Sequence, residues 1–211
     1  MIQVEPKVRG FLCTTAHPLG CLAHVEAQRQ VVEQGFDRGQ HPLLPAGPEA
    51  RPAKVLIIGM GGLGTPAALY LAAAGIGHLV LNDFDHIEMS NLQRQISYQE
   101  SDIGVSKVLV TQQRLQQLNS QIRVRTIKQK MTPAQLAMEL MMVDLVLDCS
   151  DNMATRQMIN AACVQAKVPS IVAAAIRLEG QLMFFDHRSD DAACYHCLFP
   201  STEEAQLNCS N

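Results

Sequence analysis

The 211-residue sequence has no large excess of charge of either sign and no long hydrophobic run. Seventeen basic residues stand against 20 acidic ones, which gives a net charge of −3. The basic residues are scattered singly, so the chain lacks the positive field that binds nucleic acid. No apolar run reaches the 18 residues of a membrane span, and the N-terminus lacks the apolar core of a signal peptide. We expect a soluble, cytoplasmic protein whose partners include neither nucleic acid nor a membrane.

The sequence also lacks internal repeats and low-complexity tracts. It does not have the even number of cysteines that is typical of a disulfide-stabilised protein. Seven cysteines are scattered through a chain of ordinary composition, which favours reduced thiols and a metal or reactive site. Hydrophobic residues make up 47 % of the chain and charged residues 18 %. This composition predicts one main domain with a sizeable core and little disorder.

Three segments of different composition divide the chain. Residues 1–35 read as an extended stretch and a short helix, and residues 36–53 form a linker rich in proline and glycine. From residue 54 to 211, short apolar runs alternate with helical patterns. We therefore predict an N-terminal extension over 1–35, a linker over 36–53 and a main domain over 54–211.

The alternating pattern of the main domain predicts its fold class. Strands are expected over 54–59, 78–83, 122–129, 143–149, 169–176 and 180–185. Helices are expected over 63–75, 106–119, 132–141 and 153–167, the second with Ser106 as its cap. This order implies an α/β, doubly wound and mostly parallel sheet of the Rossmann-like nucleotide-binding type, preceded by a short extension.

A glycine-rich stretch, GMGGLG, joins the first strand to its helix. Gly59, Gly61 and Gly64 have the G-x-G-x-x-G spacing that lets backbone N–H groups and a helix N-terminus approach a phosphate. Asp83 ends the second strand, where a carboxylate can hold ribose hydroxyls. The pattern predicts a nucleotide site, and the alternative is a turn needed only for close packing. Nicotinamide, flavin and adenylate binders share the pattern, so it leaves the chemistry open.

A polar cluster after Asp83 is more specific. Arg94 and Lys107 supply two cations, and Asp151 follows the strand 143–149 at its carboxyl end, where such sheets place ligands. Cations and Mg²⁺ offset the charge that builds on phosphoryl oxygens, and no side-chain nucleophile is required. The cluster predicts transfer at a nucleotide α-phosphate, with adenylation of a carboxylate as the reaction.

Three long motifs resemble the ThiF/MoeB/HesA family, the bacterial relatives of ubiquitin-activating enzymes, and most closely its ThiF branch. They are VLIIGMGGLGTPAALYLAAAGIGHLVLNDFDHIEMSNLQRQI, DCSDNMATRQMINAAC and AAAIRLEGQL, within roughly residues 54–211. The resemblance implies ATP- and Mg²⁺-dependent adenylation of the C-terminal Gly-Gly carboxylate of a small ubiquitin-like sulfur-carrier protein, in thiamine or molybdopterin synthesis. It also implies a homodimer and a sulfur donor such as a cysteine desulfurase.

The resemblance also implies roles for individual residues. The phosphates would be lined by a glycine loop made of Gly59, Gly61, Gly62 and Gly64, with the ribose bound by Asp83. The triphosphate would be covered by a polar turn made of Ser90, Asn91, Gln93 and Arg94. Lys107 matches the phosphate lysine and Asp151 the magnesium aspartate, with Asn152 beside it in the nucleotide site. The carrier carboxylate is ionised at neutral pH, so it would attack without a general base, while Arg94 and Lys107 hold the leaving pyrophosphate.

The cysteines near the end of the sequence complete the comparison with the family. Cys194 and Cys197 match the first half of a four-thiolate zinc site, and the sequence ends before a second CxxC pair. We therefore expect a chain that is truncated at its C-terminus and holds half a zinc site. Cys209 matches the loop cysteine that handles sulfur in the ThiF branch, and a bystander role in the tail stays open.

The N-terminal segment departs from the family. PKVRGFLCTTAHPLGCLAHVEAQ, within residues 1–35, resembles the start of trans-2-enoyl-acyl-carrier reductases. That likeness includes none of the reductases' catalytic residues, so it implies no activity. ThiF relatives begin instead with a helix whose arginine reaches the partner subunit's ATP.

Three functions stay open on the sequence alone. The first is the adenylyltransferase that Arg94, Lys107 and Asp151 support, and the second is a NAD(P)H-dependent reductase. A reductase would need a catalytic Tyr and Lys pair, and none of the chain's three tyrosines is followed by a suitably spaced lysine. The third is a non-catalytic module that binds nucleotide or carrier.

Two groups of sulfur-containing residues are expected to be structural. Cys149 and Cys163 lie in apolar contexts and are predicted to be buried. The methionines at 138, 141 and 142 are predicted to fill the core.

Overall fold

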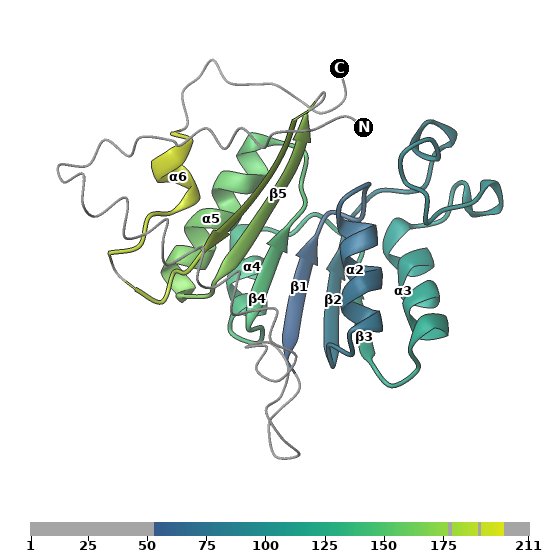
Figure 1. Ribbon diagram of the computed structural model, residues 1–211, viewed down its shortest axis with the longest axis horizontal. Helices are drawn as coiled ribbons and strands as arrows, with labels where there is room; N and C mark the ends of the chain where they lie inside the picture. The colour runs from purple at the N-terminus through teal and green to yellow at the C-terminus, as the bar shows by residue number, and fades with distance from the viewer. Residues whose placement is uncertain (1–52, 177–178, 190, 201–211) are drawn as a thin grey trace, which may run out of the picture. The chain divides into compact units, whose positions relative to one another are not determined.

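The computed structural model describes residues 53–176, 179–189 and 191–200. Within them lies a six-stranded sheet with the order β3-β2-β1-β4-β5-β6, in which β6 runs antiparallel to β5 and all other pairs are parallel (Figure 1). The strands are β1 (Lys54–Ile58), β2 (His78–Asn82), β3 (Arg123–Ile127), β4 (Leu145–Asp148), β5 (Ser170–Ile176) and β6 (Glu179–Phe185). The strand order reverses between β1 and β4, which is where open sheets of this kind bind ligands.

Helices cover both faces of the sheet. The α-helices are α2 (Gly64–Ala73), α3 (Lys107–Leu118), α4 (Pro133–Leu140), α5 (Met153–Ala166) and the short α6 (Tyr195–Leu198), with 3₁₀ turns η1 (Met89–Asn91) and η2 (Glu100–Asp102). Apolar side chains of α2 and α3 pack with alternate residues of β1 and β2 in one core cluster. Those of α4 and α5 pack with the other set of alternate residues in a second cluster. The two clusters explain the continuous apolar strands, since a parallel strand is buried on both faces.

The predicted doubly wound sheet is confirmed, and each predicted strand and helix begins and ends within two residues of its observed bounds. Ser106 stands at the N-cap position of α3, but its side chain makes no capping hydrogen bond. The predicted extension over 1–35 and all of the linker except Ala53 lie outside the described residues. Within the described part, no helix is long and apolar enough to cross a bilayer.

The predictions for sulfur-containing residues met different outcomes. Cys163 is fully buried, as predicted, and Cys149 is partly buried beside the first core cluster. Burial raises the pKa of both thiols to about 12, so both stay protonated at neutral pH. The prediction that the methionines of α4 and the turn after it fill the core is wrong, because Met138, Met141 and Met142 are 53 %, 79 % and 49 % exposed.

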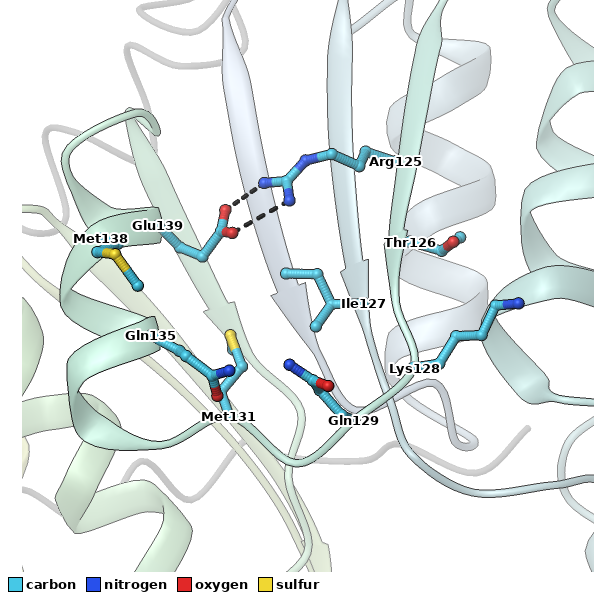
Figure 2. Close-up of a pocket in the computed structure, with 9 residues that line it drawn as sticks. All are labelled: Arg125, Thr126, Ile127, Lys128, Gln129, Met131, Gln135, Met138 and Glu139. Carbon is cyan, nitrogen blue, oxygen red and sulfur yellow. Dashed lines mark hydrogen bonds and ion pairs between the residues drawn. The ribbon is translucent and has the colours of Figure 1, made fainter.

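A surface pocket of about 400 Å³ lies between β3 and α4 (Figure 2). Its walls include Met131, Gln135 and Met138, and Arg125 forms an ion pair with Glu139 across it. None of the residues predicted to bind nucleotide lines this pocket. The candidate site therefore lies elsewhere, at the carboxyl ends of the central strands.

We predict that His187 makes the stability of the β5–β6 region depend on pH. Its Nε2 lies 3.0 Å from the Ser170 hydroxyl, its ring stacks on Phe185, and burial lowers its pKa against the opposing effect of Asp186. The unfolded chain, with a histidine pKa of about 6.5, then binds more protons than the folded chain as pH falls. His187 therefore stabilises the fold above about pH 6.5, and this contribution is lost as pH falls below that value.

Urea unfolding of wild type and His187→Gln at pH 7.5 and pH 5.5 checks this prediction. Other titrating groups are common to both proteins, so the difference between their unfolding free energies isolates His187. We expect the wild-type advantage at pH 7.5 to shrink at pH 5.5. An advantage that stays constant or grows would contradict a neutral, buried His187.

Candidate nucleotide site

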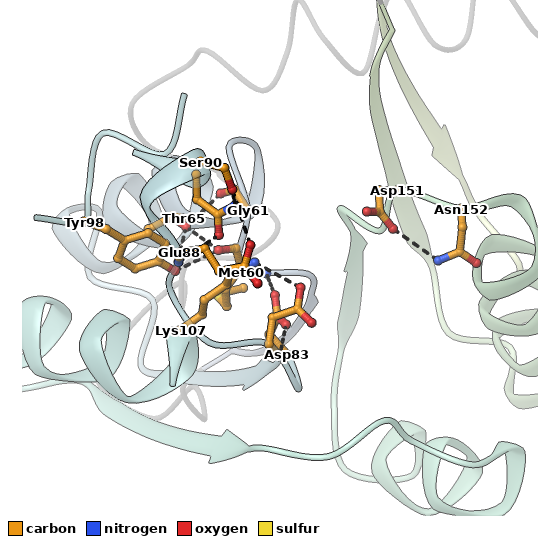
Figure 3. Close-up of polar contacts among 12 residues, drawn as sticks. Met60, Gly61, Thr65, Asp83, Glu88, Ser90, Tyr98, Lys107, Asp151 and Asn152 are labelled. Carbon is orange, nitrogen blue, oxygen red and sulfur yellow. Dashed lines mark hydrogen bonds and ion pairs between the residues drawn. The ribbon is translucent and has the colours of Figure 1, made fainter. Parts of the chain in front are cut away.

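The candidate site lies where β1, β2 and β4 end. Figure 3 shows Asp83, Glu88, Ser90 and Lys107 gathered around the turn that holds Met60. Asp151 and Asn152 follow β4, the other neighbour of β1. The sheet topology thus brings the glycine loop, the ribose carboxylate and the metal carboxylate of the sequence prediction to three adjacent strand ends.

Two glycines of the loop are required by close packing. Gly59 has φ +94°, and a Cβ there would lie 2.6 Å from the carbonyl oxygen of Cys149. A Cβ on Gly64 would lie 1.8 Å from the carbonyl oxygen of Gly59. Both distances are shorter than any van der Waals contact. The packing explanation for the glycine pattern therefore holds for these two positions, in addition to any role in phosphate binding.

The other two loop glycines face the polar turn. A Cβ on Gly62 would lie 3.2 Å from the carbonyl oxygen of Arg94, and one on Gly61 would lie 3.7 Å from Nε2 of Gln95. The turn that follows η1 therefore lies directly against the glycine loop. A side chain at Gly62 would require the turn to shift by a few tenths of an ångström.

Met60, within the glycine loop, is held on both of its main-chain groups. Its N–H donates to Oδ2 of Asp83 at 2.7 Å, and its carbonyl accepts from the Tyr98 hydroxyl at 2.8 Å and from Oγ1 of Thr65 at 3.0 Å. Tyr98 also lies 3.1 Å from Oγ1 of Thr111. Burial raises the pKa of Tyr98, so its phenol keeps the proton that it donates. The loop is preorganised by these contacts (Figure 3).

Tyr98→Phe is expected to lower the unfolding free energy by about 1 kcal/mol, the usual net loss for one hydrogen bond. Thr65 still binds the Met60 carbonyl in the variant, so the fold is kept. Nucleotide affinity should fall by no more than about fivefold, because a free-energy change of about 1 kcal/mol corresponds to about a fivefold change in affinity. Urea unfolding and nucleotide titration measure both effects. An unchanged unfolding midpoint would show that the Tyr98 hydroxyl does not fix the loop.

Asp83 has capacity for a ligand beyond its internal contacts. Its Oδ1 accepts from the N–H of Asp85 at 2.8 Å and its Oδ2 from Met60. Burial raises its pKa, while these two hydrogen bonds and the nearby Lys107 lower it in part. A carboxylate has about four acceptor sites, so two remain for hydroxyl groups. This fits the predicted ribose contact.

Lys107 lies at the start of α3 with only 5 % of its surface exposed. Its Nζ forms an ion pair of 3.0 Å with Oδ2 of Asp85, whose side chain is half exposed. An ammonium has three donors, so Lys107 can keep Asp85 and still bind an anion. The pair holds the Lys107 ammonium in place within the candidate site.

The polar turn is held largely by contacts within itself. The Ser90 hydroxyl donates to Glu88 at 3.3 Å, the Ser90 carbonyl accepts from Arg94 at 3.3 Å, and Asn91 accepts from the N–H of Glu88 at 3.4 Å. Arg94 and Gln93 are exposed. These contacts leave the Arg94 guanidinium near the surface, where it can reach an anion.

Gln95 is a candidate site residue that the sequence prediction missed. It is 4 % exposed, lies against Gly61, and its Oε1 has no hydrogen-bond partner among the described residues. Gln93, which the prediction chose, points to solvent. The QRQ stretch contains both glutamines, and they differ in that Gln95 lies on the buried face of the turn and Gln93 on the exposed face.

Asp151 and Asn152 form the turn between β4 and α5. The Asn152 side chain caps α5 by accepting from the N–H of Thr155 at 2.9 Å, and it donates to Asp151 at 3.2 Å. Asp151 is exposed. One carboxylate at the edge of a nucleotide site fits Mg²⁺, which takes most of its other ligands from phosphate and water. Asn152 therefore acts on the turn itself, and its predicted contact with nucleotide stays a prediction.

With this geometry in view, comparison with known proteins decides the family. Residues 47–211 match the ThiF family. The chain belongs to the ThiF family. The polar turn, Lys107 and the Asp151 turn all fall within the matched range, as the sequence resemblance predicted.

Curated ThiF-family relatives include two adenylyltransferases of Escherichia coli K12. The chain is 52 % identical over 157 residues to the sulfur carrier protein ThiS adenylyltransferase, covering 74 % of this chain and 62 % of the relative. It is 42 % identical over 182 residues to the molybdopterin-synthase adenylyltransferase, covering 86 % of this chain and 70 % of the relative. The chain thus spans less than two thirds of the first relative.

A solved structure with the same fold contains a nucleotide. E. coli MccB in complex with ATP superimposes with a TM-score of 0.63 at 31 % identity, covering 69 % of this chain and 44 % of MccB. A second family match covers residues 3–78 and is the NAD(P)H binding domain of trans-2-enoyl-CoA reductase. The predicted likeness of the N-terminal segment to reductases is confirmed, and this match extends through β1 and the glycine loop.

The cysteine pair expected from the ThiF family lies at α6. The sulfur atoms of Cys194 and Cys197 are 3.5 Å apart, and Nδ2 of Asn160 lies 3.5 Å from the Cys194 sulfur. Burial acts to raise the pKa of Cys194, but hydrogen bonds from Asn160, Cys197 and His196 outweigh it and lower the pKa. The described residues contain no cluster of three or more metal-binding side chains. Two thiols would supply two of the four ligands of a structural zinc site, and zinc at this pair stays a prediction. Cys209 lies outside the described residues.

Proposed function

We propose that this chain binds ATP with Mg²⁺ and adenylates the C-terminal Gly-Gly carboxylate of a small ubiquitin-like sulfur-carrier protein, releasing pyrophosphate. The observation that carries the proposal is the convergence of the fixed glycine loop, Asp83, Lys107 and Asp151 at three adjacent strand ends of a ThiF-family domain. The names of the relatives support it, since both are adenylyltransferases and one acts on ThiS. MccB with bound ATP supports the choice of nucleotide.

The glycine loop and the start of α2 would hold the phosphates. Helix α2 begins without a side-chain cap and without an acidic residue in its first turn. Its positive dipole end is therefore not offset by a carboxylate of the first turn and favours an anion. The ribose hydroxyls would donate to the two open acceptor sites of Asp83, which orients the α-phosphate toward the carrier.

Charge stabilisation accounts for the reaction step. The carrier carboxylate is ionised at neutral pH and attacks the α-phosphate, the phosphoanhydride bond breaks, and pyrophosphate leaves with the bonding electrons. Lys107 and Arg94 would attract the charge that develops on the phosphoryl oxygens and the leaving group. Mg²⁺, when bound, supplies further positive charge there, and Asp151 is the residue that would hold it.

We extend the proposal to partners and remaining residues. It includes Ser90, Asn91, Gln93 and Asn152 in the nucleotide site, Cys209 in sulfur handling, and a division of the chain at 35 and 53. It also includes a homodimer, a cysteine desulfurase as sulfur donor, zinc at the cysteine pair, and the cytoplasm as location. Thiamine and molybdopterin synthesis are the two candidate pathways.

Carrier-dependent exchange of labelled pyrophosphate into ATP tests the proposal. Wild type and Asp151→Ala are compared with Mg²⁺ and carriers that end in Gly-Gly, after circular dichroism shows that both are folded. We expect exchange by wild type and its loss in the variant. A folded wild type that binds ATP without exchange would leave a non-catalytic binding module. Thermal protection by NADH and none by ATP would favour a reductase.

A further inference from the structure

Ser150, the residue before Asp151, has all of its polar groups held by two ionisable side chains. Its N–H and its hydroxyl donate to Oδ1 of Asp148 at 2.9 Å and 2.6 Å. Its carbonyl accepts from Nη2 of Arg156. A residue bound at its donor, its acceptor and its side chain cannot reorient without breaking these bonds. The turn that presents Asp151 is therefore fixed at the residue that precedes Asp151.

Asp148, Ser150 and Arg156 form what we call the clamp, and all three are buried. Asp148 is 0 % exposed, Arg156 6 % and Ser150 9 %. Oδ2 of Asp148 has no hydrogen-bond partner among the described residues, so this carboxylate is used through one oxygen only. Burying an arginine and an aspartate is costly unless their contacts are specific. Among the described residues, both of them bind Ser150, Asp148 through its N–H and hydroxyl and Arg156 through its carbonyl, which points to the turn as the reason for their burial.

Arg156 also ties the turn to the next strand. Its Nη2 donates to the carbonyl of Ala173 in β5 at 3.2 Å. Asp148 is the last residue of β4, so the clamp spans two neighbouring strands and α5. On its other side the turn abuts the glycine loop, since a Cβ on Gly59 would lie 3.2 Å from the N atom of Ser150.

Beyond the clamp, the turn is open to solvent. Asp151 is exposed, and among the described residues its Oδ1 accepts a single hydrogen bond, the 3.2 Å contact from Asn152. The turn is rigid on its buried side and presents a carboxylate on its open side. This arrangement suits a carboxylate that binds a metal ion, because supporting contacts fix the position of a metal ligand.

We propose that Arg156 and Asp148 are positioning residues that act through Ser150 to hold Asp151 where a nucleotide-bound divalent cation needs it. The inference rests on the proposed function for the identity of the nucleotide. Nη2 of Arg156 donates to carbonyls on two different elements, and the rigid guanidinium fixes the position of that nitrogen, whereas a lysine ammonium sits on a flexible stem.

Mn²⁺ binding to the full chain tests the clamp without requiring turnover. Mn²⁺ is a paramagnetic substitute for Mg²⁺, and electron paramagnetic resonance of the free ion gives its affinity in the presence of saturating ATP. The variants are Arg156→Met, Arg156→Lys and Ser150→Ala, with Arg125→Met as a control. Arg125 pairs with Glu139 at the edge of the sheet, away from the turn. Metal-free ATP binding is measured in parallel in EDTA.

We expect Arg156→Met to weaken Mn²⁺ binding in the ATP complex by about 10-fold or more, the usual effect of losing a supporting contact. Arg156→Lys should have an intermediate effect, and metal-free ATP binding should change less than about twofold in every variant. If Arg156→Met does not fold, Arg156→Lys and Ser150→Ala carry the test. The proposal is overturned if the folded variants bind Mn²⁺ as tightly as wild type does. It is also overturned if the variants lose metal-free ATP binding by the same factor as Mn²⁺ binding.

The outcomes separate the clamp from the proposed function. If wild type catalyses pyrophosphate exchange and the Arg156 variants bind Mn²⁺ as tightly as wild type, the proposed function stands and the clamp is overturned. If wild type catalyses no exchange but its ATP-dependent binding of Mn²⁺ is weakened by the Arg156 substitutions, the clamp stands and the proposed function is overturned. Wild type with no ATP-dependent Mn²⁺ binding overturns both.

Discussion

Gly64→Ala will destabilise the domain by more than about 3 kcal/mol, the upper range for inserting one methyl group into a packed site. The added Cβ would lie 1.8 Å from the carbonyl oxygen of Gly59 and 3.2 Å from the Met60 side chain. The neighbouring atom is main chain at the end of β1, so it cannot move aside without displacing the glycine loop. Urea unfolding followed by circular dichroism measures the loss.

Gly180→Ala is the matched control, because a Cβ at Gly180 in β6 meets nothing within 4 Å. We expect its unfolding free energy to stay within about 0.5 kcal/mol of wild type. If Gly64→Ala were as stable as Gly180→Ala, the close contact between the first turn of α2 and the end of β1 would be wrong. The assignment of the glycine loop would then need revision.

Lys107→Met will lower the rate of carrier-dependent pyrophosphate exchange by about 100-fold or more, as expected when a cation that stabilises a phosphoryl transition state is removed. The fold should survive, because Lys107 pairs with Asp85, whose side chain is half exposed and can be solvated by water. The effect should appear mainly in the maximal rate at saturating ATP. Initial exchange rates over a range of ATP concentrations measure it.

Lys130→Met provides the control for a general loss of positive charge. Lys130 is exposed in the segment between β3 and α4 and is not among the predicted site residues. Its exchange rate should match that of wild type. A Lys107→Met variant that is folded and as active as Lys130→Met would remove Lys107 from the proposed mechanism.

The sheet could be predicted because its signals are local. KVLII, HLVLN and LVLD are short, mainly apolar runs that a parallel sheet buries on both faces. The first is followed by Gly59, the second by Asp83, and the third ends in Asp148. The exposed methionines were missed although the pattern of α4 contained the answer. Leu136 and Leu140, four residues apart, are the buried positions of α4, and Met138 falls on the opposite face.

The residues that preorganise the site depend on tertiary structure and could not be predicted from spacing. Tyr98 reaches Met60 across 38 residues, and Arg156 reaches Ser150 and Ala173 on separate elements. Gln95 differs from Gln93 only in the face of the turn that it occupies. The sequence identified charged and glycine residues by type, whereas the contacts that fix them come from how the strand ends meet.

Direct detection of the acyl-adenylate tests the central proposal most sharply. The folded chain is incubated with ATP, Mg²⁺ and sulfur-carrier proteins of the thiamine and molybdopterin pathways, each with and without its terminal glycine, and the carriers are analysed by mass spectrometry. We predict that an intact carrier gains the mass of one adenylyl group, and that the shortened carrier and the Asp151→Ala reaction gain none. Carriers that stay unmodified by a folded, ATP-binding chain would contradict adenylation as its function.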